Sequence, residues 1–443
     1  DLAALYDTYE RMPSEKYVSP EIMLKIMLYA YHEGKEISSR TIEKNCKRDI
    51  NYMYLLEGRQ APDHAAIARF RTKHFGKCAN LFLSQMTKIL LELKQLTKTE
   101  VFIDGTKIEA SANKYTFVWK KAVTKHQEKH LRKTALLVGD IIERYGCKPL
   151  WRKQVKKKHV KKLLKQLKIE AEKRELEFVS GRGHRKQQLQ KDIEDLEAAL
   201  QKLKEYETKL HRCGARNSYS KTDHDATFMH MKEDHMMNGQ LKPAYNIQHA
   251  VNSGFIVAAK VFPNPTDVMT LKPFMEQMEA SLQFQFARVV ADAGYESEEN
   301  LVYLRDKGIE AYIKPSNYEQ IGTKKFEKEI GRKENMQYDQ AGDYYICHNG
   351  KRVEKTGVKT RKTASGYLRE ETHYECKDCS GCLCKEKCLA GKNWKKPLEE
   401  RNKKLTVSRL FEEMREEEYR LINSEEGKKL RMNRSIQAEG GFA

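Results

Sequence analysis

Two apolar runs that each end in an aspartate closely followed by a glycine constrain this chain more than any other feature. Residues 101–105 read Val-Phe-Ile-Asp-Gly, and residues 289–294 read Val-Val-Ala-Asp-Ala-Gly. Such runs predict buried strands, and a carboxylate on the lip of a buried strand needs a partner because an unpaired buried charge is costly. The pair therefore predicts a site that binds something cationic. Turn chemistry is the alternative, since Asp-Gly and Asp-Ala-Gly are common in turns.

The elements around the second aspartate predict an α/β fold. Strand-like runs cover 244–252 and 255–262 and are separated by Ser253-Gly254, which indicates a hairpin. A helix over 267–281, the strand that ends at Asp292, a helix capped by Ser297 and a strand over 310–315 follow. With the strand before Asp104, this order predicts a mixed sheet with helices.

The first 95 residues read as short helices. Apolar residues at helical spacing cover 20–34, where Pro20 suits the first turn and Gly34 a stop. A second helix is expected after a cap at Ser38 or Ser39, and a third after a cap at Asp63. The last helix would bury Ile67, Phe70 and Phe75 and would turn three basic side chains outward, namely Arg69, Arg71 and Lys73. This pattern resembles a helix-turn-helix DNA-binding module; the alternative is an ordinary helical subdomain with a solvated basic face.

The charge of the chain points to a polyanionic partner. The net charge is +20, and 28 Lys and Arg against 13 Asp and Glu lie between Lys120 and Arg216. Nucleic acid is the commonest such partner, although a merely soluble basic protein remains the alternative. Within the basic segment, Val160, Leu164 and Leu167 begin one apolar seam, and a heptad stripe follows at Leu189, Ile193, Leu196, Leu200, Leu203 and Leu210. With a turn at 180–183, we expect an antiparallel coiled-coil hairpin that serves as a spacer, a dimer contact or an arm for phosphates.

Five of the ten cysteines crowd into thirteen residues: Cys376, Cys379, Cys382, Cys384 and Cys388. Four thiolates at such short spacing are typical of structural zinc, and Cys347 or His373 could join them. Any four of the five could bind, and five unrelated thiols are the alternative. Zinc would here stabilise a loop-rich insertion that lacks an apolar core.

Phosphodiester chemistry often uses two divalent cations, and magnesium prefers carboxylate oxygens. Two acids from neighbouring strands and a third from a packed helix would suit that purpose, and Glu439 supplies a helical candidate near the end of the chain. A second polar cluster, Asp223, His224 and Asp225, could position DNA, but an exposed loop is the favoured interpretation.

The chain resembles the DDE transposases of bacterial insertion sequences. The stretches that carry the resemblance are "SPEIMLKIMLYAY", "SSRTIEKNC", "PDHAAIARFR", "FIDGTKIEASANKY", "KPAYNIQHAV", "ADAGYESEENLVYLRDKGIEAYI", "YDQAGDYYICHNGK" with the cysteine cluster, and "LRMNRSIQAEG". They follow the order of that family over nearly the whole chain. The resemblance implies an RNase H-like catalytic core with a mixed five-stranded sheet, a helical N-terminal domain, the inserted basic coiled coil and the Cys-rich insertion.

Carried over residue by residue, the resemblance implies that Asp104, Asp292 and Glu439 hold two Mg²⁺ or Mn²⁺ ions. It also places Arg434 against DNA phosphate. The family carries a Lys downstream of that Glu, and this sequence ends at Ala443 without one. We therefore expect the last helix to be truncated and Glu439 to be poorly placed.

The resemblance and the sequence patterns together divide the chain into six segments. They are 1–95 for the helical DNA-binding domain, 96–119 for the first core strand, 120–217 for the coiled-coil insertion, 218–315 for the core with Asp292, 316–400 for the Cys-rich insertion and 401–443 for the C-terminal core helix.

The function implied is a transposase that cleaves DNA at the ends of its element and joins the strands to target DNA. Its partners would be double-stranded DNA, as terminal inverted repeats and target, and further copies of itself in a homodimer or larger synaptic complex. The alternatives are a nuclease of the same fold without strand transfer, and a decayed relic that only binds DNA. No stretch approaches the roughly 18 apolar residues that span a membrane, and we expect a cytoplasmic, nucleoid-associated bacterial protein.

Overall fold

The computed structural model describes residues 1–10, 18–34, 38–148, 155–181, 185–231, 239–389 and 396–439. The chain divides into two compact units. The first comprises Asp1–Gly105, Gln248–Lys260 and Asp267–Ala443, and the second comprises Thr106–Ile247 and Val261–Thr266.

The first unit begins with short helices: α1 (Ala3–Tyr6), α2 (Pro20–Glu33), α3 (Ser39–Cys46), α4 (Ile50–Leu55), α5 (His64–Arg69), the π-helical η1 (Phe70–Phe75) and α6 (Gly76–Glu92). Their ends follow the predicted signals. Ser38 Oγ accepts the Thr41 N–H at 3.1 Å, and Asp63 Oδ1 accepts the Ala66 N–H at 2.6 Å. Gly34 ends α2 in the left-handed region, with φ of 63°, where glycine meets no Cβ penalty.

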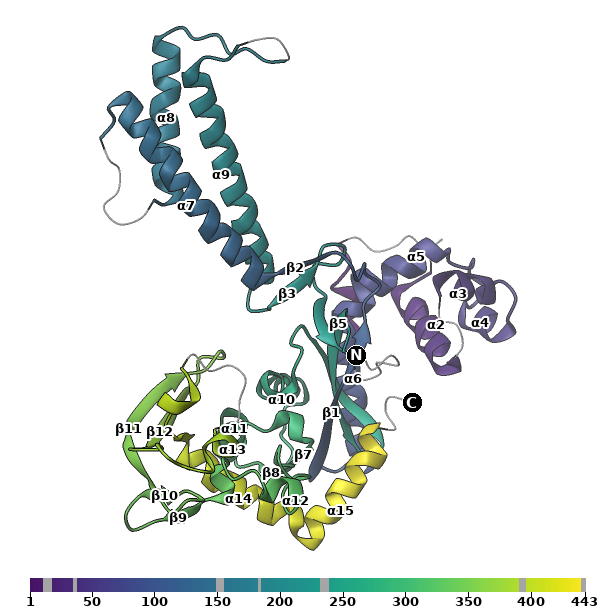
Figure 1. Ribbon diagram of the computed structural model, residues 1–443. Helices are drawn as coiled ribbons and strands as arrows, with labels where there is room; N and C mark the ends of the chain where they lie inside the picture. The colour runs from purple at the N-terminus through teal and green to yellow at the C-terminus, as the bar shows by residue number, and fades with distance from the viewer. Residues whose placement is uncertain are drawn as a thin grey trace. The chain divides into compact units, whose positions relative to one another are not determined.

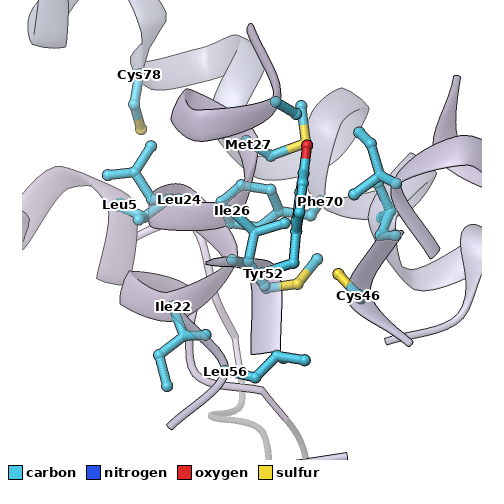
Figure 2. Close-up of a cluster of buried hydrophobic side chains, with 14 residues drawn as sticks. Leu5, Ile22, Leu24, Ile26, Met27, Cys46, Tyr52, Leu56, Phe70 and Cys78 are labelled. Atoms are coloured by element: carbon cyan, nitrogen blue, oxygen red, sulfur yellow. The ribbon is translucent and has the colours of Figure 1, made fainter. Parts of the chain in front are cut away.

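A single apolar cluster holds these helices together, and Figure 2 shows its side chains converging from several of them. Ile67 and Phe70 are buried as predicted, and Phe75 is partly buried against them. Arg69 and Lys73 are exposed, as predicted, whereas Arg71 is half-buried.

The core of the fold is a mixed sheet in the order β4-β5-β1-β7-β8, with β6 paired to β5. Its strands are β1 (Glu100–Glu109), β4 (Thr227–His230), β5 (Leu241–Asn252), β6 (Phe255–Phe262), β7 (Arg288–Ala291) and β8 (Glu310–Ile313). β7 is parallel to β1 and β8, whereas β4 is antiparallel to β5. The predicted mixed sheet is confirmed, with six strands instead of five, because the four-residue β4 is too short to give a periodic signal.

Ser253 and Gly254 join β5 to β6. Both have positive φ, 52° and 84°, which is the backbone of the two-residue turns that suit the twist of a hairpin. The predicted hairpin is therefore confirmed.

Seven helical segments accompany this sheet in the first unit: η2 (Asp267–Met269), α10 (Leu271–Leu282), η3 (Ala293–Tyr295), α11 (Glu298–Asp306), α14 (Arg409–Asn423), α15 (Glu425–Arg434) and the π-helical η6 (Ser435–Glu439). Phe102, Val290 and Tyr312 are paired neighbours across β1, β7 and β8 and so share one face of the sheet. Ile422 of α14 and Leu430 of α15 pack against that face in one apolar cluster, and Figure 1 shows these helices in yellow beside the sheet.

The segment between β8 and α14 folds into a second, antiparallel sheet in the order β13-β12-β11-β10-β9. Its elements are α12 (Lys324–Glu327), η4 (Lys333–Asn335), β9 (Gln337–Asp339), β10 (Tyr344–Ile346), β11 (Arg352–Lys362), β12 (Leu368–Cys376), α13 (Lys385–Cys388), η5 (Leu398–Glu400) and β13 (Lys404–Val407). Val353, Tyr374, Cys376 and Val407 form a buried cluster. The expectation of a loop-rich insertion without an apolar core is therefore wrong, because strands rich in Lys, Glu and Thr conceal their few core positions.

The second unit holds three long helices, α7 (Lys120–Tyr145), α8 (Lys157–Lys173) and α9 (Gln188–Cys213), and a short strand pair, β2 (Phe117–Trp119) and β3 (Ser218–Ser220). Figure 1 shows the three helices side by side. Val160, Leu167 and the stripe from Leu189 to Leu200 are buried as predicted, but α7 adds Val138 and Ile141 to the same cluster. The segment is therefore a three-helix bundle and not the predicted two-helix hairpin. Residues 182–183 of the predicted turn lie outside the described residues.

No helix in the described part of the chain is long and apolar enough to cross a membrane.

Candidate active site

Asp104 and Asp292 follow paired residues of two neighbouring parallel strands. Ile103 of β1 pairs with Ala291 of β7, so the two aspartates are next in line at the same level of the sheet. Asp104 is 5% exposed, and its Oδ1 accepts the N–H of Gly105 at 2.8 Å. Asp292 is half-buried and accepts the N–H of Gly294 at 2.8 Å. The two carboxylates are thus each held by a backbone donor.

β1 does not end at Asp104, as the sequence pattern predicts, but continues to Glu109. Asp104 therefore lies in the middle of a strand that runs between β5 and β7. Burial declines beyond Gly105, through the half-buried Thr106 and Lys107 to the exposed Ile108 and Glu109, while the backbone stays extended.

Burial raises the pKa of Asp292, and the negative charges of Asp104 and Asp267 raise it further. The Gly294 N–H and the guanidinium of Arg434 oppose this shift. Like charges this close favour the neutral acid unless a cation joins them. The site is therefore electrostatically suited to a positively charged ligand.

Arg434, the last residue of α15, faces this pair of acids. Its Nη1 lies 3.7 Å from Asp104 Oδ2, and its side chain is 20% exposed. The resemblance assigned this residue to DNA phosphate; in the structure it lies against a carboxylate, from which a phosphate could draw it away.

Glu439 is the last residue of η6, and its side chain lies outside the described residues. The residue before it is anchored: Ala438 is fully buried, and its carbonyl accepts a hydrogen bond from His249 Nε2 of β5 at 3.1 Å. The end of this final turn is thus tied to the sheet.

Sequence reasoning missed three residues that surround the two acids. Gln248 of β5 donates from Nε2 to Asp267 Oδ1 at 2.9 Å and accepts a hydrogen bond from the Tyr295 hydroxyl. Gln248 and Tyr295 are both fully buried. The available signal was the polar pair Gln248-His249 between the apolar residues Ile247 and Ala250 of β5, since buried polar side chains require partners.

The donor chemistry of Asp104 and Asp292 suits Mg²⁺ or Mn²⁺, which take carboxylate oxygens. Within the described ranges, however, no group of three or more His, Cys, Asp or Glu side chains is arranged to hold a metal ion. Of the three predicted ligands, the structure describes the side chains of Asp104 and Asp292, whereas the side chain of Glu439 lies outside the described residues.

The cysteines of the insertion gather around one small pocket. Its lining includes Cys347, Cys376, Cys379, Cys382 and Cys388, whereas Cys384 is not part of it. Burial raises the pKa of Cys376 to about 11, and the neighbouring thiol of Cys379 adds to the shift. Burial likewise raises the pKa of Cys388. All ten cysteines are free thiols, so no disulfide holds this cluster together.

The basic residues of the N-terminal helices line a cleft of the first unit. Arg69, Lys73, His74 and Lys77 contribute to its wall. In the second unit, Asp223 serves a local role: its Oδ2 accepts the Tyr245 hydroxyl at 2.6 Å, and its Oδ1 accepts the N–H of Asp225 at 3.1 Å. These bonds shape the turn before β4.

A mixed sheet with helices packed on it, and with acids on neighbouring parallel strands, is the architecture of an RNase H-like core. Three family models match the chain: "Transposase domain (DUF772)" over residues 1–73, "Transposase DDE domain" over 216–383, and a second "Transposase DDE domain" over 346–443. The chain belongs to the DDE transposases of insertion sequences, whose substrate is DNA. No curated protein and no solved structure matches it.

Proposed function

We propose that this transposase cleaves DNA at the ends of its element and joins the freed 3′ hydroxyl to target DNA. The observation that supports the proposal best is the pairing of Ile103 with Ala291, which brings Asp104 and Asp292 together. With Glu439, these acids would hold two Mg²⁺ or Mn²⁺ ions. When bound, such ions activate the attacking oxygen and stabilise the leaving oxygen of an in-line displacement.

The residues of the chain itself orient the acids. The N–H groups of Gly105 and Gly294 fix one oxygen of each carboxylate. Arg434 would neutralise Asp104 before DNA arrives and turn to a phosphate oxygen afterwards, because a guanidinium binds both groups well. Arg69 and Lys73, exposed on the N-terminal helices, would add phosphate contacts.

Two copies or more would assemble with two element ends and the target. The alternative functions are a nuclease of the same fold that does not join strands, and a DNA-binding relic.

The zinc site of the insertion is part of the same proposal. Of the thiols that line its pocket, any four would be the ligands, so Cys347 enters the set and Cys384 leaves it. Thiol side chains lose their protons when they bind zinc, and the shared ion would draw their sulfur atoms closer together.

The function is tested with a labelled duplex that carries one element end. Asp292→Asn keeps the size of the side chain and removes its charge, so nicking in Mg²⁺ or Mn²⁺ should fall by at least about 100-fold while DNA affinity stays near wild type. Asp306→Asn, on the exposed end of α11, is the matched control and should cleave normally.

Substantial residual nicking by Asp292→Asn would refute the assignment of the acids. Products that join to unlabelled target DNA separate a transposase from a nuclease, and an inactive wild-type protein that still binds the element end would indicate a relic.

A further inference from the structure

Gly105, which follows Asp104, has a steric role and not a turn role. Gly105 lies within β1 and does not have a positive φ, so its backbone would accept any residue. A methyl group added to it would stand 2.2 Å from Gln248 Nε2 and 3.1 Å from Asp267 Oδ1. What requires glycine at this position is therefore the close approach of two polar side chains.

Asp267 reaches the second glycine as well. A methyl group added to Gly294 would stand 3.4 Å from Asp267 Oδ2 and 3.0 Å from Asp292 Oδ1. One oxygen of Asp267 thus faces the backbone that follows Asp104, and the other faces the backbone that follows Asp292. The carboxylate lies between the two segments that carry the predicted acids.

Two buried side chains, Gln248 and Tyr295, hold the Asp267 carboxylate in place. Gln248 donates to Asp267 Oδ1 at 2.9 Å, and the amide of Gln248 is itself oriented by the hydroxyl of Tyr295. Because both side chains are fully buried, loss of one bond would leave a polar atom without water to replace it, which is costly.

The backbone on either side is clamped by Asn300 of α11. Its Nδ2 donates to the carbonyl of Val268, next to Asp267, at 2.9 Å and to the carbonyl of Tyr295 at 2.8 Å. The Asp267 carbonyl also accepts hydrogen bonds from the Thr270 hydroxyl at 2.7 Å and from its N–H at 2.9 Å. Asp267 and Tyr295 are therefore fixed relative to each other.

We propose that Asp267, Gln248 and Tyr295 form a hydrogen-bonded bracket that sets the spacing of Asp104 and Asp292. The bracket acts through the glycines that follow the two acids, and its members are positioning residues. This inference rests on the proposed function, since the spacing matters for the ions that the two acids would share. Displacement of a reacting group by about 1 Å can cost about 100-fold in rate.

Three substitutions test the bracket. Asp267→Asn keeps an oxygen that accepts from Gln248, so it should retain most of the cleavage rate. Asp267→Ala removes that oxygen, and Tyr295→Phe removes only the hydroxyl; both should lower kcat by about 10- to 100-fold with unchanged DNA affinity. Tyr303→Phe, which removes a hydroxyl on α11, is the matched control and should behave as wild type.

A second measurement does not depend on cleavage. The rise in melting temperature with added Mn²⁺ should be lost in Asp292→Asn, should need at least about tenfold more Mn²⁺ in Asp267→Ala and Tyr295→Phe, and should be near normal in Asp267→Asn. If the wild type binds Mn²⁺ in this way but does not cleave, the proposed function fails while the bracket stands.

Three results would overturn the bracket. Equal losses in Asp267→Asn and Asp267→Ala, with Tyr295→Phe unaffected, would make Asp267 a metal ligand. Wild-type behaviour of Asp267→Ala would make it a bystander. If the melting temperature of the wild type did not respond to Mn²⁺, Asp104 and Asp292 would share no ion, and the bracket would have no spacing to set.

Discussion

Glu418 is a buried carboxyl group that has no part in the proposed cleavage chemistry. It lies on α14, is 7% exposed, and its Oε2 accepts the N–H of Ile313 at the end of β8 at 3.0 Å. Burial raises its pKa from 4.5 to about 8, the charges of Glu417 and Glu296 add to the shift, and the Ile313 N–H opposes it. The folded protein therefore keeps a proton here that the unfolded chain releases.

The pKa shift of Glu418 predicts how stability depends on pH. Between pH 4.5 and about 8 the folded state binds the extra proton, so this contribution to stability falls as pH rises through that window. Glu418→Gln imitates the neutral acid, and should raise the free energy of unfolding at pH 8.5 by on the order of a few kcal/mol relative to wild type.

Thermal unfolding at pH 5 and pH 8.5 measures this effect. The gap in melting temperature between Glu418→Gln and wild type should widen towards alkaline pH. Glu413→Gln, on the exposed side of the same helix, should show no such widening. A constant gap would mean that Glu418 is ionised in the folded protein at neutral pH.

At the scale of elements, the insertion combines a five-stranded sheet with a pocket of thiols. Cys347 follows β10 and Cys376 ends β12, while Cys379, Cys382 and Cys388 come from the turn and the short helix α13. Strand ends fix the first two thiols, and a metal would fix the rest. The sheet therefore fixes the positions of two of the five candidate ligands.

Purified protein should contain about one zinc ion per chain by elemental analysis, by the four-ligand geometry of structural zinc. Cys376→Ser combined with Cys379→Ser should lose the zinc and lower the melting temperature of the insertion. Cys384→Ser is the matched control, since Cys384 does not line the pocket, and should keep both. Zinc-free wild-type protein with an unchanged melting temperature, or loss of zinc from Cys384→Ser, would contradict the proposed ligand set.

At the scale of the whole molecule, charge is divided unevenly along the chain. Much of the net charge of +20 comes from the segment that forms the three-helix bundle. Helix α8 alone exposes six lysines, four of which are Lys158, Lys161, Lys162 and Lys165. A surface of this kind favours phosphate contacts that are independent of base sequence.

Replacement of these four lysines by glutamine keeps helix propensity nearly unchanged and should weaken the salt dependence of DNA binding. Each phosphate contact contributes about 0.9 to the slope of log affinity against log salt, so the slope should fall by at least about 1. Fluorescence anisotropy with a labelled duplex at several salt concentrations measures it.

A matched variant removes the same charge from the insertion, by replacing Lys324, Lys325, Lys328 and Lys359, which are also exposed. Its slope should remain near wild type. If the wild type and both variants had equal slopes, the bundle would serve as a spacer or a protein contact. If the slope fell equally in both variants, the effect would come from net charge alone.

Short-range signals in the sequence predicted much of the fold. Helix caps at Ser38 and Asp63, the Ser253-Gly254 turn and the apolar runs before Asp104 and Asp292 depend on neighbours close in sequence, so pattern reasoning finds them. The same reasoning missed α7 as a partner of the bundle, because its apolar stripe is sparse. It also missed the insertion sheet, whose longest strand, β11, exposes most of its residues.

The sequence by itself determined that acids would stand beside buried strands, that the chain is strongly basic, and that it resembles a transposase. Those properties follow from residue type and local order. Only the tertiary structure decided that Asp104 and Asp292 are level on parallel strands, and that Asp267 and Gln248 lie against the glycine after Asp104. Residues 104, 248, 267 and 292 are brought together by strand pairing across long loops, and no local pattern encodes which strands pair.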